Sequence, residues 1–561
     1  MILGRYVQFS FALIKPYMPR CLPLLLLGLL AALLTLPVLA VGLSWLQFGP
    51  ESALVLGEMV RTVLPGYTGT SLLLCLAVAL GVTVVGLTAA CAVTLFDFTG
   101  RRVVEWALLL PLAMPAYVVA YAYTDFLQFS GPLQGWLREA FGLQGRVFPE
   151  VRNTAGAAWV FTFSLYPYVY LLARTALGER ASHLMEAARL LGAPLRRRVA
   201  EVALPLARPA VAAGVALALM ETLADFGVAS YFGIQTFTAG IYKAWLSMDN
   251  RLAAAQLATV LLVLVALLLR LEHGAQRRMR FATTRSGHGG AAEATPVRLC
   301  GRWAALALAL CLAPIAFGFV LPVAFMLRPL VQGWGELPWG PFAGWALNSL
   351  WLAGLSAALA TVLALGLAFA VRVQTGHSNG SDWRARFTRG VAQLASLGYA
   401  VPGAVIVVGL LLPVGWLQAV APQTSAGYWV TATALGIVWA YLVRFVAVAL
   451  QSVQSGYARV PTSLDESARM LGTTGLGLAW RVHAPLLRRS TAAAALLVFV
   501  DVMKELPATL VLRPFNSDTL AVMAYQLARD ERLGEAALPA LALVLVGLVP
   551  VVMLSRTLRG R

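Results

Sequence analysis

The stretch Glu186-Ala-Ala-Arg-Leu-Leu-Gly192 occurs twice in this chain, and its second copy reads Glu466-Ser-Ala-Arg-Met-Leu-Gly472. Nine of the 23 positions from 186 to 208 are identical to the positions 280 residues later, without a gap. Each copy lies in a polar segment between apolar sequences, and each is followed by a proline, Pro205 or Pro485. The repeat predicts a duplicated unit that presents the same polar segment twice.

The composition places the chain in a membrane. Of its 561 residues, 60% are apolar and only 12% are charged, and the mean hydropathy is +0.77. Soluble globular domains contain about 45–50% apolar residues. Runs of roughly 20 apolar residues, the length that crosses a bilayer as a helix, recur along the sequence. The sequence therefore predicts an all-α polytopic protein whose surroundings are the lipid bilayer.

We expect about twelve membrane-spanning helices, six in each half. With the N-terminus in the cytoplasm, most of the 43 Lys and Arg residues fall in cytoplasmic segments, which is the bias that sets orientation. Both termini are then cytoplasmic. The net charge of +18 follows from this topology, so we expect no nucleic-acid partner. The expected spans are residues 21–45, 69–96, 104–126, 155–173, 209–232, 252–270, 303–327, 347–371, 391–413, 428–450, 489–512 and 536–555.

A change of composition divides the chain into two repeated membrane domains. The linker carries Arg277-Arg-Met-Arg280 and several glycines, and it should lie in the cytoplasm. An even number of spans in each half leaves both halves in the same orientation. The expected domains are an N-terminal anchor helix with a periplasmic loop (1–66), the first membrane domain (67–272), the basic linker (273–302), a helix and periplasmic loop leading into the second half (303–345), and the second membrane domain (346–555).

The repeated stretch is typical of a short cytoplasmic helix, a turn and a return to the membrane. The glycine supplies the turn, and the proline is expected to open the next membrane helix, where its missing N–H costs least. The pattern of Glu-Ala-Ala, glycine and Leu-Pro resembles the coupling loop of permease subunits in bacterial ABC importers of the type I fold. We name residues 182–205 and 462–485 the first and second coupling segments.

In that family the short helix fits a groove on a cytosolic ATPase, so the resemblance implies two ATPase copies, one on each segment. The alternative is an ordinary amphipathic cytosolic loop. The second copy departs from the pattern at Ser467 and at Ala484, which precedes the proline. The residues implied are Glu186, Ala187, Ala188, Gly192 and Pro205 in the first segment and Glu466, Ser467, Ala468, Gly472 and Pro485 in the second.

The chain itself is not expected to hydrolyse ATP. A phosphate-binding loop of the P-loop type needs a Gly-Lys pair. The three lysines of the sequence, Lys15, Lys243 and Lys504, follow isoleucine, tyrosine and methionine. We therefore expect no catalytic residue and no cofactor in this chain, and we expect ATP and Mg to be bound by the partner ATPase.

Four acidic residues lie inside expected spans. Glu221 and Asp225 match Asp501 and Glu505 at the offset of 280, and each pair has the i, i+4 spacing that shares one helix face. Charges at such depth are costly and usually face a pathway or a partner. We expect these carboxylates to line a translocation pathway or gate for a cation. The alternative is that Lys504 neutralises one of them as a structural pair.

Longer stretches resemble the fused two-domain permeases of bacterial ferric-iron importers. They are Met220–Gly233, Gly240–Trp245 and Lys504–Pro514, and the resemblance covers roughly residues 70–555. It implies an inner-membrane protein that receives Fe(III) from a periplasmic iron-binding protein and moves it by alternating access. Importers of thiamine, sulfate or polyamines share the coupling loop and stay open as alternatives. An ion-gradient-driven secondary transporter is the more distant one.

No firm metal site is expected in the sequence. Tyr121, Tyr123 and Asp125 offer phenolate and carboxylate oxygens near the outer end of a span, which makes them weak candidates for iron ligands. Their alternative role is an interfacial aromatic belt. The five cysteines are scattered without a CxxC pair, so neither a metal cage nor a disulfide framework is expected.

Overall fold

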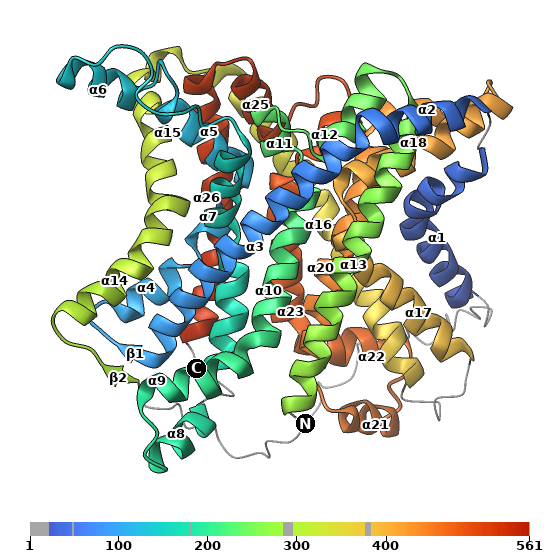
Figure 1. Ribbon diagram of the computed structural model, residues 1–561. Helices are drawn as coiled ribbons and strands as arrows, with labels where there is room; N and C mark the ends of the chain where they lie inside the picture. Colours follow the sequence, from blue (N-terminus) through green and yellow to red (C-terminus); the bar gives the residue numbers. More distant parts are fainter. Residues whose placement is uncertain (1–21, 48–49, 179–181, 284–295, 376–382, 560–561) are drawn as a thin grey trace, which may run out of the picture.

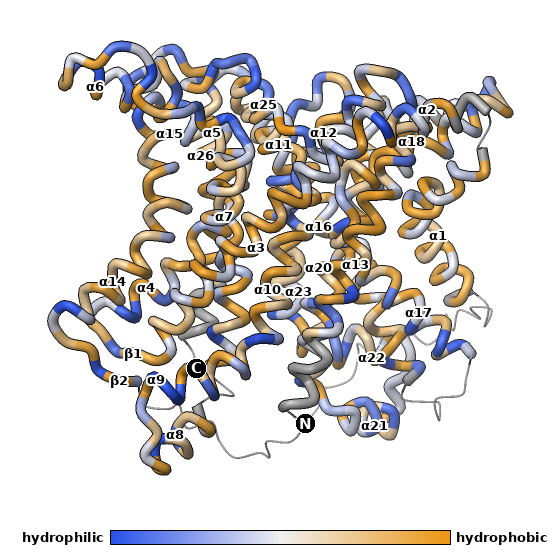
Figure 2. The backbone as a smooth tube through the Cα atoms, in the orientation of Figure 1, coloured by the Kyte–Doolittle hydropathy of each residue, from blue (hydrophilic) through white to orange (hydrophobic). Residues whose placement is uncertain are grey.

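The computed structural model describes residues 22–47, 50–178, 182–283, 296–375 and 383–559. Within these residues the protein consists of helices that run between two more polar ends, with apolar residues along their middle (Figures 1 and 2). The strands of this described part are β1 (Phe96–Asp97) and β2 (Val297–Arg298), which pair in parallel. The expected all-α polytopic architecture is confirmed.

Ten helices of the described residues are long and apolar enough to cross a membrane, and counting one bent pair, Arg101–Ala113 with Ala116–Phe141, gives eleven. Some of these spans join consecutive helical elements. The long elements are α1 (Leu22–Leu43), α3 (Leu64–Leu95), α7 (Thr154–Ala176), α10 (Leu204–Ala224), α13 (Arg251–Thr283), α14 (Arg302–Ile315) with α15 (Leu321–Gln332), α16 (Trp339–Thr375), α18 (Gly403–Val420), α20 (Ala434–Tyr457) and α26 (Leu533–Arg559).

The one expected span not counted so far, residues 489–512, corresponds to α23 (Ala484–Lys504). Its 21 residues are enough for a crossing, but two arginines near its start and an aspartate and a lysine near its end make it more polar than the other spans. The helix packs against α16, α20 and α26. It holds the position in the second half that α10 holds in the first, so protein neighbours shield its charges from lipid.

The two halves repeat one order of elements, as the sequence predicts. The first half continues from α3 through α4 (Arg101–Ala107), η2 (Leu110–Ala113), α5 (Ala116–Leu127), α7, α8 (Ser182–Leu190), α9 (Leu195–Arg198), η4 (Val199–Ala203), α10, α11 (Gly227–Phe232), α12 (Phe237–Tyr242) and α13. The second half continues from α16 through α17 (Trp383–Leu397), η8 (Gly398–Ala400), α18, α20, α21 (Thr462–Met470), α22 (Leu476–Leu478), η9 (Ala479–His483), α23, α24 (Pro507–Leu512), α25 (Leu520–Arg529) and α26.

The first helix of each half packs on the other half (Figure 1). Helix α1 lies against α17 and α18, and the indole of Trp439 in α20 donates to the carbonyl of Leu33 at 2.8 Å. That carbonyl lies four residues before Pro37, which has no N–H to pair with it. The bond therefore satisfies a carbonyl that a proline frees inside a membrane helix.

Helices α14 and α15 make the reciprocal contact through η6 (Ala316–Val320), which has π-helical spacing. In that spacing the carbonyl of Phe317 would pair with residue 322, which is a proline. The hydroxyl of Tyr123 in α5 donates to this carbonyl at 2.7 Å instead. Long-range side-chain bonds to proline-freed carbonyls thus fasten each leading helix to the opposite half.

Two helices of the membrane region are broken at prolines. Pro115 and Pro402 have extended backbone (ψ of 142° and 140°) and cap α5 and α18 after the short turns η2 and η8. Residues before a proline disfavour the α conformation, which explains why the preceding helices end there. The same break in both halves brings backbone carbonyls to the centre of the protein.

Several expected loops contain helices. The periplasmic loop expected at 46–68 holds α2 (Pro50–Thr62), and α3 begins at Leu64. The linker expected at 273–302 is shorter, because α13 continues to Thr283; residues 284–295, and the first 21 residues of the expected anchor domain, lie outside the described residues. The remaining short elements are η1 (Ser44–Gln47), α6 (Pro132–Phe141), η5 (Lys243–Ser247), η7 (Trp334–Glu336) and α19 (Ala426–Thr431).

Candidate functional site

The two coupling segments fold alike. Each has a short helix, α8 or α21, that ends at a glycine with left-handed backbone: φ is 80° at Gly192 and 78° at Gly472. In the first segment Gly192 donates to the carbonyl of Arg189 at 2.9 Å and Ala193 to that of Ala188 at 3.0 Å. The second segment has the same two bonds. These are the bonds of a Schellman cap, and they explain why glycine stands at both positions.

The short helix of each coupling segment carries one exposed glutamate, and an exposed apolar pair lies at its C-terminal end. Glu186 and Glu466 are both exposed. Leu190 and Leu191 are 85% and 88% exposed, and Met470 and Leu471, their counterparts in the repeat, are 89% and 85% exposed. The two short helices project from the same end of the molecule (Figure 1). Apolar side chains exposed beyond the ends of the membrane helices are typical of a surface that binds another protein.

The small residues of the pattern differ in their burial. Ala187 is exposed, Ala188 is half-buried, and Ala468 is buried against the rest of the second segment. Ser467, which replaces an alanine of the pattern, donates its hydroxyl to the carbonyl of Ser463 at 2.9 Å. This bond lies within the helix, so the serine keeps the helical geometry of the segment.

Pro205 and Pro485 lie in the first turn of α10 and α23, as expected, but a π-helical turn precedes each of these helices. The helix of the first half already begins at Leu195, and a π-helical turn, η4, ends at Ala203 just before the proline. The second half has η9 in the same place. A π turn places the carbonyl that would clash with the proline ring one residue farther back. Each proline therefore lies within a continuous helix that leads from the coupling segment into the membrane.

The four intramembrane carboxylates all line one cavity of about 190 Å³ between the two halves. The other polar residues around it include Ser164 and Tyr168 of α7, Tyr399 of η8, Arg444 of α20 and Lys504. The structure thus brings Glu221, Asp225, Asp501 and Glu505 together, as the sequence predicts. The i, i+4 argument is wrong in detail, because α10 and α23 end between the two members of each pair.

Asp225 and Glu505 cap the short helices that follow the two breaks. Asp225 accepts the N–H of Val228, in α11, at 2.8 Å. Glu505 accepts the N–H groups of Ala508 and Thr509, in α24, at 3.0 Å each. Acidic side chains at a helix N-terminus satisfy free N–H groups and interact favourably with the helix dipole. Both carboxylates therefore have a structural part in the fold.

Glu221 and Asp501 do not cap a helix. No hydrogen bond or ion pair joins either carboxylate to another group of the described residues, and both are half-buried at the cavity wall. Each lies in the electrostatic field of the other. Carboxylate and phenol oxygens, with Tyr168 and Tyr399 beside them, are donors that suit a hard cation.

Two cations border the cavity, and both belong to the second half. Arg444 Nη1 lies 3.4 Å from Glu505 Oε1, and this pair is almost completely buried. Lys504 Nζ donates to the carbonyl of Leu112 at 2.9 Å, which is a bond to the first half. Sequence reasoning named Lys504 but missed Arg444, although a lone arginine within an apolar span signals an intramembrane role.

Two of the three weak iron-ligand candidates, Tyr121 and Tyr123, have different neighbours in the structure. The Tyr121 ring packs against Tyr231 of α11, 4.6 Å away. Tyr123 uses its hydroxyl for the Phe317 carbonyl and lies against Phe325 of α15. Successive positions of α5 therefore point to different neighbours, and the described residues contain no group of three or more His, Cys, Asp or Glu side chains that could hold a metal.

Direct bonds join the halves on the side of the cavity away from the coupling segments. Tyr117 and Tyr242 of the first half donate to the carbonyls of Lys504 and Pro507 at 3.3 and 2.6 Å. The Ser230 and Tyr525 hydroxyls lie 2.7 Å apart. These contacts close the molecule where α11 meets α25 (Figure 1) and where Tyr242 of α12 reaches Pro507 of α24.

The comparison with known proteins decides the family. A family model described as the binding-protein-dependent transport system inner membrane component matches residues 81–281. A probable sulfate transport system permease protein, cysT of Chlorella vulgaris, is 30% identical over 198 residues, which cover 34% of this chain and 70% of that relative. The chain belongs to this family of inner membrane permeases.

Two relatives extend over both halves of the permease. The Fe(3+)-transport system permease protein FbpB 2 of Haemophilus influenzae is 25% identical over 554 residues, 96% of this chain and 99% of that protein. The ferric transport system permease protein FbpB of Actinobacillus pleuropneumoniae is 23% identical over 86% of this chain and 69% of its own length. The permease is thus a fused, two-domain, multi-pass inner membrane protein. Its family supplies the non-catalytic membrane subunit of ABC importers, which work with a binding protein and an ATPase.

Proposed function

We propose that this permease carries ferric iron, delivered by a periplasmic binding protein, across the inner membrane by alternating access. The observation that carries the proposal is the pair Glu221 and Asp501, two carboxylates at the wall of the central cavity that form no hydrogen bond or ion pair among the described residues. Trivalent iron is a hard cation that prefers oxygen ligands. Relatives that match over most of the chain are named as ferric transport permeases.

Energy is proposed to come from two copies of a cytosolic ATPase, which bind ATP and Mg. One copy docks on Glu186 and the exposed pair Leu190 and Leu191, and the other docks on Glu466 with Met470 and Leu471. Two docking helices at one end of the molecule, each joined to a helix that reaches the cavity, support this arrangement. It places both termini and the central linker on the cytoplasmic side, in agreement with the positive charges there.

Alternating access would exchange the contacts on the two sides of the cavity. The bonds of Tyr117, Tyr242 and Ser230 to the second half close the outer side. Closure of the two ATPase subunits would draw α8 and α21 together and separate these outer contacts. The cavity would then open toward the loaded binding protein, and the carboxylates of Glu221 and Asp501 would accept the cation.

Sulfate is the second candidate, because relatives named sulfate transport permeases match part of the chain and because Arg444 and Lys504 also line the cavity. Its support is weaker. Arg444 is paired with Glu505, and the cavity has four carboxylates against two cations. A dianion entering a site with an excess of negative charge is repelled. Thiamine and polyamines are organic cations and would also meet favourable charge there.

Substrate-stimulated ATP hydrolysis separates these candidates. The permease and its ATPase are reconstituted in nanodiscs, and binding proteins loaded with ferric iron, sulfate, thiamine or a polyamine are added in turn. Stimulation by the iron-loaded protein alone, lost in the Glu221→Gln/Asp501→Asn variant, is the expected result. Stimulation by a sulfate-loaded protein that survives the same double substitution would refute iron as the substrate.

A further inference from the structure

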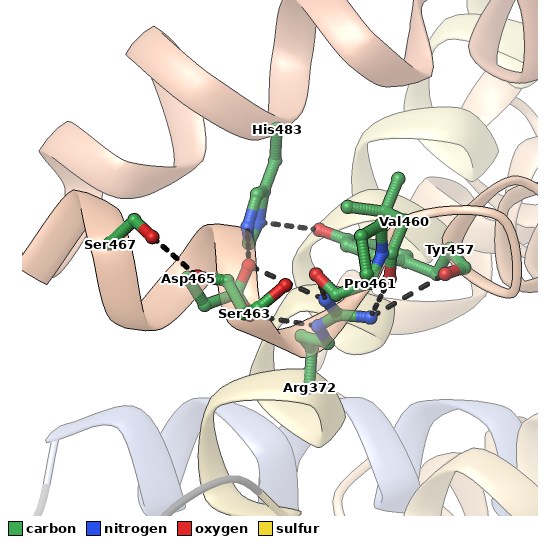
Figure 3. Close-up of polar contacts among 8 residues, drawn as sticks. All are labelled: Arg372, Tyr457, Val460, Pro461, Ser463, Asp465, Ser467 and His483. Carbon is green, nitrogen blue, oxygen red and sulfur yellow. Dashed lines mark hydrogen bonds and ion pairs between the residues drawn. The ribbon is translucent and has the colours of Figure 1, made fainter.

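The second coupling segment contains a buried polar cluster. Asp465 precedes Glu466 in α21 and is only 6% exposed. Its carboxylate accepts the Arg372 Nε at 2.8 Å and lies 3.0 Å from His483 Nε2. Figure 3 shows Asp465 held between Arg372, from the end of α16, and His483, from the turn before α23.

Arg372 also fastens the chain that leads into α21. Its guanidinium donates to the carbonyls of Val460 and Pro461 at 2.9 and 3.0 Å (Figure 3). His483 Nδ1 lies 3.1 Å from the hydroxyl of Tyr457, at the end of α20. The side chains of Arg372, Asp465 and His483 are only 13%, 9% and 2% exposed. Charge-assisted hydrogen bonds in such a dry setting hold their geometry tightly.

The cluster joins the helices that carry the charged residues of the cavity. Helix α20 runs from Tyr457 back to Arg444, and α23 runs from the turn at His483 to Asp501. At 1.5 Å per residue, Asp501 lies about 27 Å along the helix from His483. Packed rigid helices of this kind are the elements through which distant sites influence one another.

The first coupling segment has apolar residues in the equivalent places. The positions 280 residues before Tyr457, Asp465 and His483 are Leu177, Met185 and Ala203, and all three are buried. In the described part of α8, no side chain from 184 to 190 forms a hydrogen bond or ion pair with another element. Within these described residues α8 is held by packing, whereas α21 is held by packing and by directed polar bonds.

We propose that Arg372, Asp465 and His483 are positioning residues that make the second coupling segment the rigid one of the two. They fix the orientation of α21, and hence of Glu466, relative to α16, α20 and α23. Movement of an ATPase subunit docked there passes directly to the helices around the cavity, and movement at α8 passes through packing alone. This inference rests on the proposed function, because it assumes that an ATPase docks at both segments.

A double-mutant cycle tests the inference in the complex of permease and ATPase, reconstituted in nanodiscs with binding protein. The rate of stimulated ATP hydrolysis is measured for Asp465→Asn, Glu466→Ala and Glu186→Ala and for the two doubles that contain Asp465→Asn. We expect Asp465→Asn to lower this rate about fivefold or more. In the Glu466→Ala background, Asp465→Asn should lower the rate little further, because both substitutions act through the position of α21. In the Glu186→Ala background, Asp465→Asn should lower the rate by the same factor as it does in the wild type.

Equal losses in both backgrounds would overturn the inference, because a general defect in folding multiplies every rate by the same factor. The histidine gives a second test that does not depend on the aspartate variant folding. His483→Gln can keep a hydrogen bond to Asp465 and should retain most of the stimulated rate, whereas His483→Ala should lose it. Equal rates for these two variants would also contradict the inference. If Glu186→Ala and Glu466→Ala both left stimulation intact, the proposed function itself would fail.

Discussion

The Nζ of Lys504 donates a hydrogen bond to the backbone carbonyl of Leu112 across 2.9 Å, and this bond joins the end of α23 to the broken helix of the other half. The break at Pro115 interrupts the helical bonding of the turn that contains Leu112. Lys504 supplies the donor that this turn lacks. The intramembrane lysine therefore joins the two halves through a backbone carbonyl, and it also interacts electrostatically with Asp501.

Replacing Lys504 by methionine should destabilise the permease. The variant removes the donor to the Leu112 carbonyl, and a buried polar group without its partner costs about 1–3 kcal/mol. Thermal unfolding in detergent measures the effect. Lys243→Met is the matched control, because Lys243 is exposed and its loss should leave the melting temperature unchanged. Equal melting temperatures for the Lys504 variant and wild type would show that the bond to the Leu112 carbonyl contributes nothing.

The carboxylates of the cavity should separate into a structural and a functional class. Glu505→Ala leaves Arg444 buried without its partner and removes the acceptor of two backbone N–H groups, so we expect a loss of about 3–5 kcal/mol of stability. Glu221→Ala removes a group with no bonded partner in the described structure and should change stability by less than about 1 kcal/mol. Iron uptake should fall in both variants. Comparable destabilisation of the two would contradict this division.

The two left-handed glycines at the ends of α8 and α21 should resist substitution. Gly192 and Gly472 have φ near +80°, where a side chain costs about 1–2 kcal/mol although open space surrounds both positions. We expect Gly192→Ala and Gly472→Ala to weaken binding of the ATPase, measured by titration of the nanodisc-embedded permease. Gly477→Ala is the control, since Gly477 lies outside the left-handed region and a side chain there makes only an ordinary contact. A similar loss of affinity in the control would refute a backbone cause.

The contribution of Asp465 should depend on pH in a defined direction. Burial alone would raise the pKa of this carboxyl, but the hydrogen bonds from Arg372 and His483 outweigh burial and hold the pKa below its usual value. A lowered pKa stabilises the folded state at pH values above the unfolded pKa, near 4, and this stability is lost as the pH falls through the lowered value. The difference in melting temperature between wild type and Asp465→Asn should therefore be constant from about pH 6 to 8 and shrink in acid. A difference that grows in acid would contradict this.

The internal repeat was sufficient to locate several features of the structure from the sequence. The offset of 280 residues located both coupling segments and all four carboxylates, and the structure brings the carboxylates to one cavity. The glycine of each segment could be assigned to a turn because left-handed backbone is a local property. Both results depend on spacing along the chain, which a sequence records directly.

Features that depend on contacts between distant parts of the chain could not be predicted from the sequence. The exchange of α1 and α14 between halves depends on bonds such as Trp439 to Leu33, across 406 positions of chain. Assigning Asp225 to the same helix face as Glu221 failed because α10 ends at Ala224, and no proline or glycine follows directly to signal that end. The cluster around Asp465 was also missed, since the partners come from three separate elements and neither spacing nor charge pattern predicts them.

Iron uptake into proteoliposomes tests the central claim most directly. The permease and its ATPase are reconstituted so that the coupling segments, the ATPase and ATP are inside the vesicles. Radiolabelled Fe(III) is supplied outside, on the binding protein. Uptake is compared between wild type and the Glu186→Ala/Glu466→Ala variant. We predict ATP-dependent iron uptake by wild type and its loss in the double variant, with the variant still folded by thermal unfolding. Uptake that proceeds without ATP and is indifferent to both glutamates would contradict an ATP-driven importer coupled through these two segments.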